Sequence, residues 1–558
     1  MSEQSDGRLQ EVEWQFDTDR LDTVEHWLAY HSANLGYAVV DSPAQEQQDT
    51  YYDTEDWRLH RAGYALRVRL KGEGAEATLK SLAEAVDGVR SREELTEQLE
   101  NQSIEALSRA AGLLGECVRA VSGSRALRPY FEIRTNRHAY ILREADRDAG
   151  EVVLDEVTVP RAAGEEPIRF NRVEVELREA RDSTADAFVQ ALREGNRLRH
   201  ASVSKFEAGL AARGLEPASD PDLGPTAIHD GLSAGEMAFA VLRRQFGAFL
   251  SHEAGSRLGE DPEEVHDMRV AARRLRAAMK LFENVLPEDA QRLREEVGWA
   301  ASALGAVRDL DVQLQQGATW IEEAPPADRG ALEALMNVLR QRRATAHRAM
   351  LQALDSPRYD RLVSDLTSML QEGPQADEVP AARMPVLAVA PDLIERSYEK
   401  TRKLGERITG ESAPEEYHEL RIRAKRLRYA LEFFEPLYRK PVRELVPSLV
   451  AMQDVLGRHQ DAEVAMAHLR QLTTGAPRKL TPEAAFVVGG IARRYEEQAV
   501  AERAAFPEVY RDLKGNKGWK KLRQEMEKRR PPVEAEPAKI EPLHAEVVDL
   551  GAPEAQVQ

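Results

Sequence analysis

An internal repeat occupies the second half of the chain. The segment PEEVHDMRVAARRLRAAMKLFE begins at Pro262, and PEEYHELRIRAKRLRYALEFFE begins at Pro414, 152 positions later. A second pair of similar segments, LGAVRDLDV from Leu304 and LGRHQDAEV from Leu456, keeps the same separation. Two motifs that share one offset indicate a duplicated structural unit. The second half must therefore fold into two related parts.

Each repeat begins with residues that favour the start of a helix. Proline suits the first helical position, and the two glutamates that follow suit the positive end of the helix dipole. Asp261 can cap the first helix, whereas Ala413 takes that position in the second copy. At about 100° per residue, the basic residues of the first copy fall within a stripe about 80° wide, opposite the apolar residues. We expect two helices that each bury one face and present a row of cations on the other.

The basic stripe is the candidate binding surface of this half. It consists of His266, Arg269, Arg273, Arg276 and Lys280 in the first copy, and of His418, Arg421, Lys425 and Arg428 in the second, where Glu432 replaces the last lysine. Like charges at these spacings repel one another, so a linear anion such as a chain of phosphates is the expected partner. The alternative is that acidic residues of neighbouring helices neutralise the stripe. A nucleic acid is disfavoured, because aromatic residues for base stacking make up only 6% of the chain.

These motifs resemble the CHAD family. The pattern H-x-x-R-V-x-x-R-R-L-R followed by L-G-x-x-R-D-x-D, and its second copy H-x-L-R-I-x-x-K-R-L-R-Y-A-L-E, are similar to that family over about residues 229–520. The resemblance implies an all-α, duplicated helical bundle that binds inorganic polyphosphate, with repeats at about 229–371 and 389–520.

The resemblance also assigns residues to this function. The polyphosphate-binding set would be His266, Arg269, Arg273, Arg274, Arg276, Lys280, His418, Arg421, Lys425, Arg426 and Arg428. The second motif contributes Arg308, Asp309 and Asp311 in the first copy and Gln460, Asp461 and Glu463 in the second. For these acidic groups we favour a structural role, in which they pair with arginines and fix the bundle.

The first half shows the two-residue period of β-strands, with charged groups on one face. The polar faces are Glu11, Glu13 and Gln15 in residues 11–16, Arg67, Arg69 and Lys71 in residues 66–71, and Arg172, Glu174 and Glu176 in residues 172–177. On an isolated surface strand such a face would only meet water. If the sheet closes, however, these faces can line one cavity, where carboxylates can hold a hard divalent metal and arginines can hold phosphate. That combination suits metal-assisted attack on a phosphoanhydride.

The first half also resembles a known family, CYTH, over about residues 8–213. The motifs that carry this resemblance are E-x-E near the start, YYDT at 51–54, ALRVR at 65–69, TLK at 78–80, REEL at 92–95, LDE at 154–156, VEVEL at 173–177 and SKFEAG at 204–209. The resemblance implies a closed antiparallel β-barrel with flanking helices, the triphosphate tunnel. Members of the family hydrolyse inorganic or thiamine triphosphate, or cyclise ATP, with Mg²⁺ or Mn²⁺.

By position, the resemblance implies a metal site and a triphosphate site. The metal-facing carboxylates would be Glu11, Glu13, Asp155, Glu174 and Glu176, and the phosphate-binding cations would be Arg67, Arg69, Lys80, Arg137 and Lys205. Arg134 is the alternative to Arg137. The chain departs from the family at Gln15, which stands where E-x-E-x-K has its catalytic lysine, and at Arg172, where many relatives have a third glutamate. Glutamine keeps a hydrogen-bond donor but loses the positive charge.

Two functions remain open at this point. The first is metal-dependent hydrolysis of inorganic triphosphate, by Glu11, Glu13 and the residue at position 15, joined to polyphosphate binding by the helical half. The second is a polyphosphate-binding or granule-targeting protein whose turnover is impaired by Gln15. A nucleotide cyclase is a weaker third alternative, because the sequence provides no recognisable adenine site.

The overall organisation predicted is an α+β multidomain protein. A Pro-, Asp- and Gly-rich linker covers residues 214–228, and a Pro-, Glu- and Ala-rich tail over 531–558 is predicted to be disordered. The formal net charge of −19 argues against nucleic acid as a partner. The single cysteine, Cys117, and the lack of a long apolar run or signal-peptide pattern predict a cytoplasmic protein without a membrane segment, which could associate with polyphosphate granules.

Overall fold

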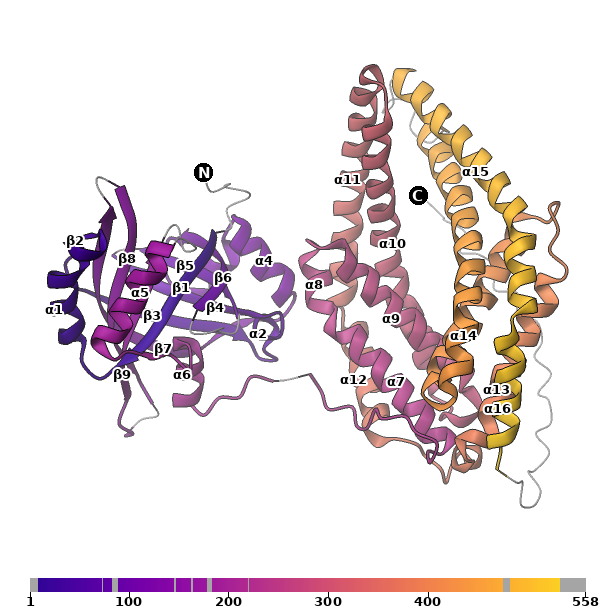
Figure 1. The fold of residues 1–558 in the computed structure, drawn as a ribbon, viewed down its shortest axis with the longest axis horizontal. Helices are drawn as coiled ribbons and strands as arrows, with labels where there is room; N and C mark the ends of the chain where they lie inside the picture. Colours follow the sequence, from indigo (N-terminus) through magenta and orange to yellow (C-terminus); the bar gives the residue numbers. More distant parts are fainter. Residues whose placement is uncertain are drawn as a thin grey trace.

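The computed structural model describes residues 9–72, 74–82, 89–144, 147–161, 164–177, 183–218, 220–474 and 482–531. The side chain of Glu11 and, apart from its first residue, the predicted disordered tail lie outside the described part. Figure 1 shows two bodies, a sheet with flanking helices formed by the first half of the chain and an array of long helices formed by the second. This confirms the predicted fold class of an antiparallel sheet domain followed by a helical region.

The N-terminal domain is built on one antiparallel sheet. Its strands are β1 (Leu9–Thr18), β2 (Ala38–Asp41), β3 (Gln45–Thr54), β4 (Tyr64–Lys71), β5 (Gly74–Ser81), β6 (Val89–Leu99), β7 (Leu127–Glu144), β8 (Arg147–Val159), β9 (Ile168–Leu177) and β10 (Arg199–His200). Neighbouring strands follow the order β10-β1-β6-β5-β4-β3-β7-β8-β9, and β2 pairs with β7. Strand β1 also pairs with β9, with Glu13 opposite Glu176, so the pairing returns to β1 and the sheet curves around an interior.

Helices cover the outer surface of this sheet. They are α1 (Leu21–His31), η1 (Ser32–Leu35), α2 (Arg58–Arg61), α3 (Ile104–Arg109), α4 (Leu113–Ser122), α5 (Ser183–Asn196) and α6 (Lys205–Ala212). Trp14 and Phe16 of β1 pack with Phe188 of α5, and Leu66 of β4 packs with Leu114 of α4. The apolar faces of these strands therefore point outward into small cores between the sheet and its helices. As a consequence, their charged faces point into the interior of the sheet.

The regular structure of the C-terminal half consists of helices in its described part, apart from one isolated bridge. It contains α7 (Ala234–Ser251), α8 (Glu253–Leu258), α9 (Pro262–Leu281), η2 (Glu283–Val285), α10 (Ala290–Glu323), α11 (Pro326–Leu354), α12 (Pro357–Glu372), η3 (Pro380–Arg383), α13 (Val386–Gly405), α14 (Pro414–Thr474), α15 (Pro482–Gly515) and α16 (Lys517–Arg529). The helices within residues 234–372, and those within 386–474 and 482–515, thus carry the two repeats. None of the helices in the described part is long and apolar enough to span a membrane.

The repeat is visible in the helices. Helices α9 and α14 begin at the two repeated prolines, and the Asp261 carboxylate accepts a hydrogen bond from the Glu263 amide, as predicted for a cap. Arg439 interrupts α14 with φ of 23° and ψ of −97°. It corresponds to Pro287, which lies in the turn between α9 and α10. Helix α14 is therefore the counterpart of α9 and α10 together, joined at a break.

The apolar side of α9 forms part of the main helical core. Met268, Ala271, Leu275, Met279 and Phe282 are all buried there, as the stripe pattern predicted. The opposite face, which carries the cations, is left available to a groove. The helices of the two repeats thus cross with their apolar sides inward.

The two domains meet along α4 and α8 (Figure 1). Between α6 and α7 the described residues form neither helix nor strand, apart from a bridge at Ser233. The Arg257 guanidinium is buried in the contact and donates to Asp355 at 2.7 Å, and Arg125 of the sheet domain pairs with Asp360 at 2.9 Å. Ion pairs therefore accompany the apolar packing between the domains.

Candidate functional site

The sheet of the N-terminal domain encloses a cavity of about 690 Å³. Nine side chains singled out from the sequence line it: Glu13, Gln15, Arg67, Arg69, Lys80, Arg137, Glu174, Glu176 and Lys205. Strands β1, β4, β5, β7 and β9 supply all but the last, which opens helix α6. Arg134, the alternative to Arg137, is exposed and is not among the residues that line the cavity. The two-residue period thus brings distant segments of the chain to one interior.

One wall of the cavity holds a dense ion-pair cluster. Arg137 donates to both oxygens of Asp155 at 2.9 and 2.7 Å and to Glu174 at 2.7 Å. The Lys205 ammonium lies 2.5 Å from Asp155 and 3.0 Å from Glu174. Burial alone would raise the pKa of Glu174, but the charges of Lys205 and Arg137 hold it well below its ordinary value. Asp155 is completely buried behind these cations and does not line the cavity.

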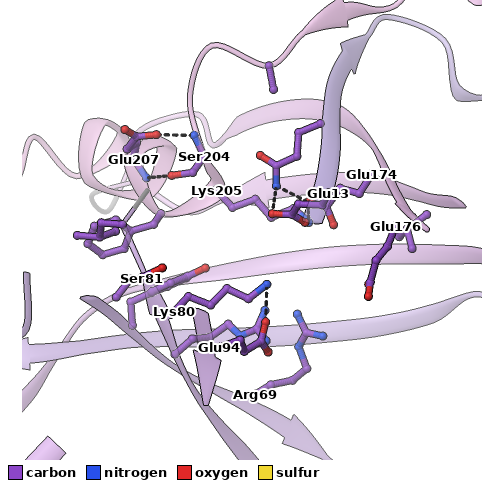
Figure 2. A pocket seen from close by; sticks show the side chains of 18 of the residues that line it. Glu13, Arg69, Lys80, Ser81, Glu94, Glu174, Glu176, Ser204, Lys205 and Glu207 are labelled. Atoms are coloured by element: carbon purple, nitrogen blue, oxygen red, sulfur yellow. Dashed lines mark hydrogen bonds and ion pairs between the residues drawn. The ribbon is translucent and has the colours of Figure 1, made fainter. Parts of the chain in front are cut away.

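The start of helix α6 positions Lys205. Ser204 caps the helix by accepting a hydrogen bond from the Glu207 amide, and the Glu207 carboxylate accepts one from the Ser204 amide. This reciprocal capping fixes the direction in which the chain enters the helix. Figure 2 shows Lys205 extending from this turn towards Glu174, with Glu13 beside it.

A second cluster pairs two arginines of β4 with an aspartate that the sequence analysis missed. Asp49 of β3 is 2% exposed and accepts hydrogen bonds from Arg69 at 2.7 and 2.9 Å, while Arg67 lies 3.8 Å away. Burial would raise the pKa of Asp49, but these two arginines lower it. Arg67 also donates to Thr78 at 3.1 Å, whereas its buried Nε has no acceptor within the described residues. That donor is therefore available to an anion.

A row of three glutamates crosses neighbouring strands β1, β9 and β8. Glu13 pairs in register with Glu176, which pairs with Glu151, and all three line the cavity. Burial raises the pKa of Glu176, and the charges of Glu151 and Glu13 raise it further. Like charges that lie directly opposite each other destabilise a sheet. This row therefore favours a cation between its members.

The chemistry of this row fits a hard divalent metal, which prefers carboxylate oxygens. In the described part of the chain, however, no group of three or more His, Cys, Asp or Glu side chains is arranged so that it could hold a metal ion. Asp155 and Glu174, both expected to face a metal, are instead bound to Arg137 and Lys205. Glu13 and Glu176 remain with Glu151 as the carboxylates that fit best.

The sequence contained the signal for the acidic residues that were missed. Glu76 lies four positions before Lys80 on β5, and Glu151 lies four positions before Asp155 on β8. The same two-residue period therefore places both glutamates on the interior face. Glu94 of the REEL motif also lines the cavity, and Lys80 contacts its carboxylate at 2.8 Å (Figure 2). The interior therefore carries more carboxylates than predicted.

Gln15 lies among the carboxylates of the cavity. Its side-chain nitrogen donates to Glu13 at 2.9 Å and to Glu174 at 3.3 Å. The glutamine thus performs with a neutral donor the contacts that an ammonium could make from the same position. The departure from the E-x-E-x-K pattern leaves the hydrogen bonds and removes the charge.

The helical half contains a groove of about 830 Å³ between helices α9, α10, α11, α14 and α15. Six of the predicted polyphosphate-binding residues line it: His266, Arg269, Arg273, His418, Arg421 and Lys425. They form three pairs related by the 152-residue offset, so the duplication places both stripes on one groove. Its opposite end is apolar, with Trp320, Leu335 and Tyr495 in the wall.

Two arginines that line the groove have close acidic partners: Arg308 pairs with Glu263 at 3.1 Å and Arg458 with Glu502 at 2.6 Å. The repeated cations of the groove do not. Arg269 lies 3.5 Å from Asp309, and the equivalent Arg421 lies 4.0 Å from Asp461. The buried Nε of Arg421 has no acceptor within the described residues. Asp309 and Asp461 of the second motif therefore lie near the groove arginines, but at distances too long to satisfy their donors. Asp311 and Glu463 instead pair with arginines outside the groove, at 2.6 and 3.1 Å.

Burial and nearby positive charges lower the pKa of the groove lysine, Lys425. Burial lowers the pKa of Lys425 to about 7, and the charges of Arg421 and Arg273 contribute to the same shift. Burial and the charge of Arg308 likewise lower the pKa of His266. Within the described residues Lys425 has no ion pair. The groove is therefore a site at which an anion would be favoured.

The other predicted basic residues lie outside the groove. Arg274 and Arg428 both contact Glu432, at 2.5 and 3.3 Å, and Lys280 pairs with Glu283 at 2.5 Å. For Arg274 and Arg428, a neighbouring carboxylate thus neutralises the charge, which was the alternative to a polyphosphate-binding role. Arg276 and Arg426 do not line the groove either, and they contribute to a separate cluster of basic residues. Burial and neighbouring arginine charges lower the pKa of both.

Comparison with known proteins identifies both domains. A model of the CYTH domain matches residues 30–210, and a model of the CHAD domain matches residues 240–470. An uncharacterized protein of Mycobacterium tuberculosis strain H37Rv is 28% identical over 472 residues, which cover 78% of this chain and 84% of that protein. Its counterpart in strain CDC 1551 matches to the same extent.

Solved structures match each domain separately. The CHAD domain of the plant Ricinus communis is 30% identical and covers 52% of this chain and 94% of that chain, with a TM-score of 0.45. A Hippeastrum protein assigned as an adenylyl cyclase, with a dominant triphosphatase activity, is 16% identical. It covers 38% of this chain and 99% of that chain, with a TM-score of 0.28. The two domain models carry the assignment: the chain belongs to the proteins that join a CYTH domain to a CHAD domain.

Proposed function

We propose that the CYTH domain hydrolyses inorganic triphosphate, or a related linear triphosphate, with the help of a divalent cation. One observation carries the proposal. A single cavity holds Arg67, Arg69 and Lys80 on neighbouring strands β4 and β5, and a row of glutamates lies on β1, β9 and β8. Guanidinium and ammonium groups bind phosphate oxygens, and carboxylates bind hard metals. Both kinds of ligand chemistry are thus available in one interior.

The glutamate row is the part of the cavity that would hold the cation. Glu13, Glu151 and Glu176 would supply its ligands, and Mg²⁺ or Mn²⁺ would stabilise charge on the phosphate oxygens and activate water when bound. Arg67 and Lys80 would orient the phosphate chain and neutralise the charge that develops on it. Because the phosphates would compete with the carboxylates for Arg137 and Lys205, substrate binding would rearrange the ion-pair cluster.

Phosphate release from tripolyphosphate, with Mg²⁺ or Mn²⁺, tests this proposal. The wild-type protein should release phosphate, and Arg137→Ala should lower the rate by at least about tenfold, since it removes a charged phosphate ligand. Arg134→Ala is the matched control, because that exposed arginine lies on the same strand outside the cavity. No release by the wild type with either metal would contradict the enzymatic function.

A binding function without turnover has its own support. Gln15 lacks the charge of the lysine in the E-x-E-x-K pattern, and the described carboxylates do not converge on a metal position. If the wild type binds tripolyphosphate but releases no phosphate, this alternative replaces the enzymatic one. The protein would then bind phosphate chains and act at polyphosphate granules.

We also propose that the CHAD domain binds inorganic polyphosphate in the groove between its repeats. The support is the set of paired cations, Arg269 with Arg421 and Arg273 with Lys425, whose acidic neighbours are distant or absent among the described residues. A linear polyanion supplies acceptors at regular intervals, and several such contacts make binding depend strongly on salt. Binding of this kind would hold the protein on polyphosphate and bring the CYTH domain to it.

A further inference from the structure

A buried arginine lies behind Gln15, outside the cavity. Arg172 of β9 is 0% exposed and pairs in register with Asp17 of β1. Its guanidinium donates to Asp17 at 2.9 Å, to the carbonyl of Val203 at 2.8 Å and to the side-chain oxygen of Gln15 at 3.4 Å. A buried charge is costly unless its donors are satisfied, so this network holds the guanidinium in one position.

The contact with Arg172 determines which way the Gln15 amide points. A guanidinium has only donors, so it must face the amide oxygen. The amide nitrogen then points to the other side, where it donates to Glu13 and Glu174. A flipped amide would place donors against donors and carboxylates against a carbonyl oxygen. The buried arginine therefore favours one orientation of the glutamine.

We propose that Arg172 is a positioning residue, which directs the Gln15 amide to Glu13 and Glu174 and supplies positive charge from behind position 15. The inference rests on the proposed function of the cavity as a triphosphate site. Gln15 and Arg172, on adjacent strands, would together supply the hydrogen bonds and the positive charge that one cationic side chain at position 15 could supply alone. A lysine introduced at position 15 would bring an ammonium against a guanidinium that is already buried.

A charge-exchange cycle tests the proposal. Gln15→Lys should lower the affinity for tripolyphosphate by about tenfold or more, because it creates repulsion with Arg172 and removes an acceptor. Arg172→Glu should also weaken binding. The double variant Gln15→Lys/Arg172→Glu should recover most of the loss, since it restores one cation among the carboxylates. Affinity is measured by calorimetry, with tripolyphosphate in EDTA and with a non-hydrolysable imido analogue in Mn²⁺, so the result does not require turnover.

A conservative substitution separates positioning from structural support. Arg172→Lys keeps the charge and should stay within about threefold of the wild-type affinity, whereas Arg172→Met should lose about tenfold. Unfolding midpoints recorded for the same proteins show whether each variant folds. If both variants fold and bind equally well, Arg172 has no positioning role.

The outcomes distinguish this inference from the function on which it rests. If the wild type binds neither tripolyphosphate in EDTA nor the imido analogue in Mn²⁺, the proposed function fails, whatever the variants do. If the wild type binds and Gln15→Lys alone strengthens binding, the function survives and the positioning role is wrong. Additive losses in the double variant would equally overturn the proposed link between positions 15 and 172.

Discussion

The cavity and the groove are both lined by cationic side chains, but the two sites differ in how closely carboxylates pair with those cations. In the cavity, Arg137 and Lys205 contact Asp155 and Glu174 at 2.5 to 3.0 Å. In the groove, the closest acidic contact of Arg269 is at 3.5 Å and that of Arg421 at 4.0 Å. Cations in the cavity are therefore balanced without a ligand, whereas the groove keeps an excess of positive charge. A net charge of −19 conceals this local difference.

The difference teaches how each site would meet a phosphate ligand. A phosphate ligand of the cavity must displace carboxylates from their arginine and lysine partners. Its affinity therefore depends on whether another cation then neutralises those carboxylates. A ligand of the groove meets donors that lack good acceptors and need not displace a strong ion pair. The same residue types thus form one site where a phosphate ligand must displace ion pairs and another where it can bind donors that lack good acceptors.

The largest expected effect is on the stability of the cavity. Arg137→Ala removes a partner of fully buried Asp155, which should cost about 3 kcal/mol of unfolding free energy. Thermal unfolding of the full chain measures this, with the exposed Arg134→Ala as control and an expected change of at most about 0.5 kcal/mol. Equal effects of the two substitutions would mean that the ion pairs of the cavity do not support the fold.

The second effect concerns the groove. The double variant Arg269→Ala/Arg421→Ala should weaken polyphosphate binding by about a hundredfold, because each removed arginine costs two or more charge-assisted hydrogen bonds. Its unfolding midpoint should stay near that of the wild type, since no strong ion pair is lost. Arg274→Ala is the control, because that arginine is bound to Glu432 outside the groove. A hundredfold loss in the control would place the polymer elsewhere.

The third effect is a pH dependence of polyphosphate binding. The pKa of Lys425 is lowered to about 7 by burial and by Arg421 and Arg273, so in the free protein the charge is lost as pH rises through that value. A bound polyanion favours the charged form of Lys425, so binding is coupled to the uptake of a proton. The affinity for polyphosphate should therefore fall as the pH rises, by about tenfold between pH 6 and pH 8.5.

Lys425→Arg isolates this contribution, because arginine stays charged throughout that range. The variant should show a flatter affinity profile above pH 7. His266 also faces the groove, and its lowered pKa moves its titration below that of an ordinary histidine. Burial raises the pKa of the Asp461 carboxyl, which also faces the groove. An unchanged profile in Lys425→Arg would show that Lys425 does not carry the pH dependence.

The smallest effect tests a position of the basic stripe at which the two repeats carry opposite charge. Glu432 neutralises Arg274 and Arg428, whereas its counterpart in the first repeat is Lys280. Glu432→Lys should free those arginines and strengthen the binding of long polyphosphate by about threefold, with no change for tripolyphosphate. Glu435→Lys is a suitable control on the same helix. No gain in affinity would mean that the polymer does not reach this flank.

Much of this arrangement follows from periodicity in the sequence. The 152-residue offset predicted that His266 and His418 belong to equivalent helices, and the two-residue period predicted that Glu13 and Arg67 each lie on the charged face of a strand. Whether those faces converge on one ligand depends on how the strands pair, which periodicity alone does not determine. The structure shows that each pair lines one cavity or groove.

The partners of these groups could not be predicted in the same way. Asp155 is bound to Arg137 because β7 and β8 pair in a particular register, which no local pattern specifies. Glu432 contacts Arg274 because α9 and α14 cross at that point, 158 residues apart in sequence. Such contacts depend on tertiary geometry, so the sequence predicted which residues are charged but not which charges remain available.

The central claim is that Arg137 and Lys205 of the cavity are already paired with carboxylates, whereas Arg269, Arg273, Arg421 and Lys425 of the groove have no close acidic partner among the described residues. Calorimetric titration of the wild type, with a non-hydrolysable imido analogue of tripolyphosphate and with long polyphosphate, in EDTA and then in Mn²⁺, tests it directly. We predict that Mn²⁺ strengthens binding of the analogue by at least about tenfold, because the metal compensates the displaced carboxylates, and does not strengthen binding of polyphosphate. Tight analogue binding in EDTA that Mn²⁺ leaves unchanged would contradict the claim.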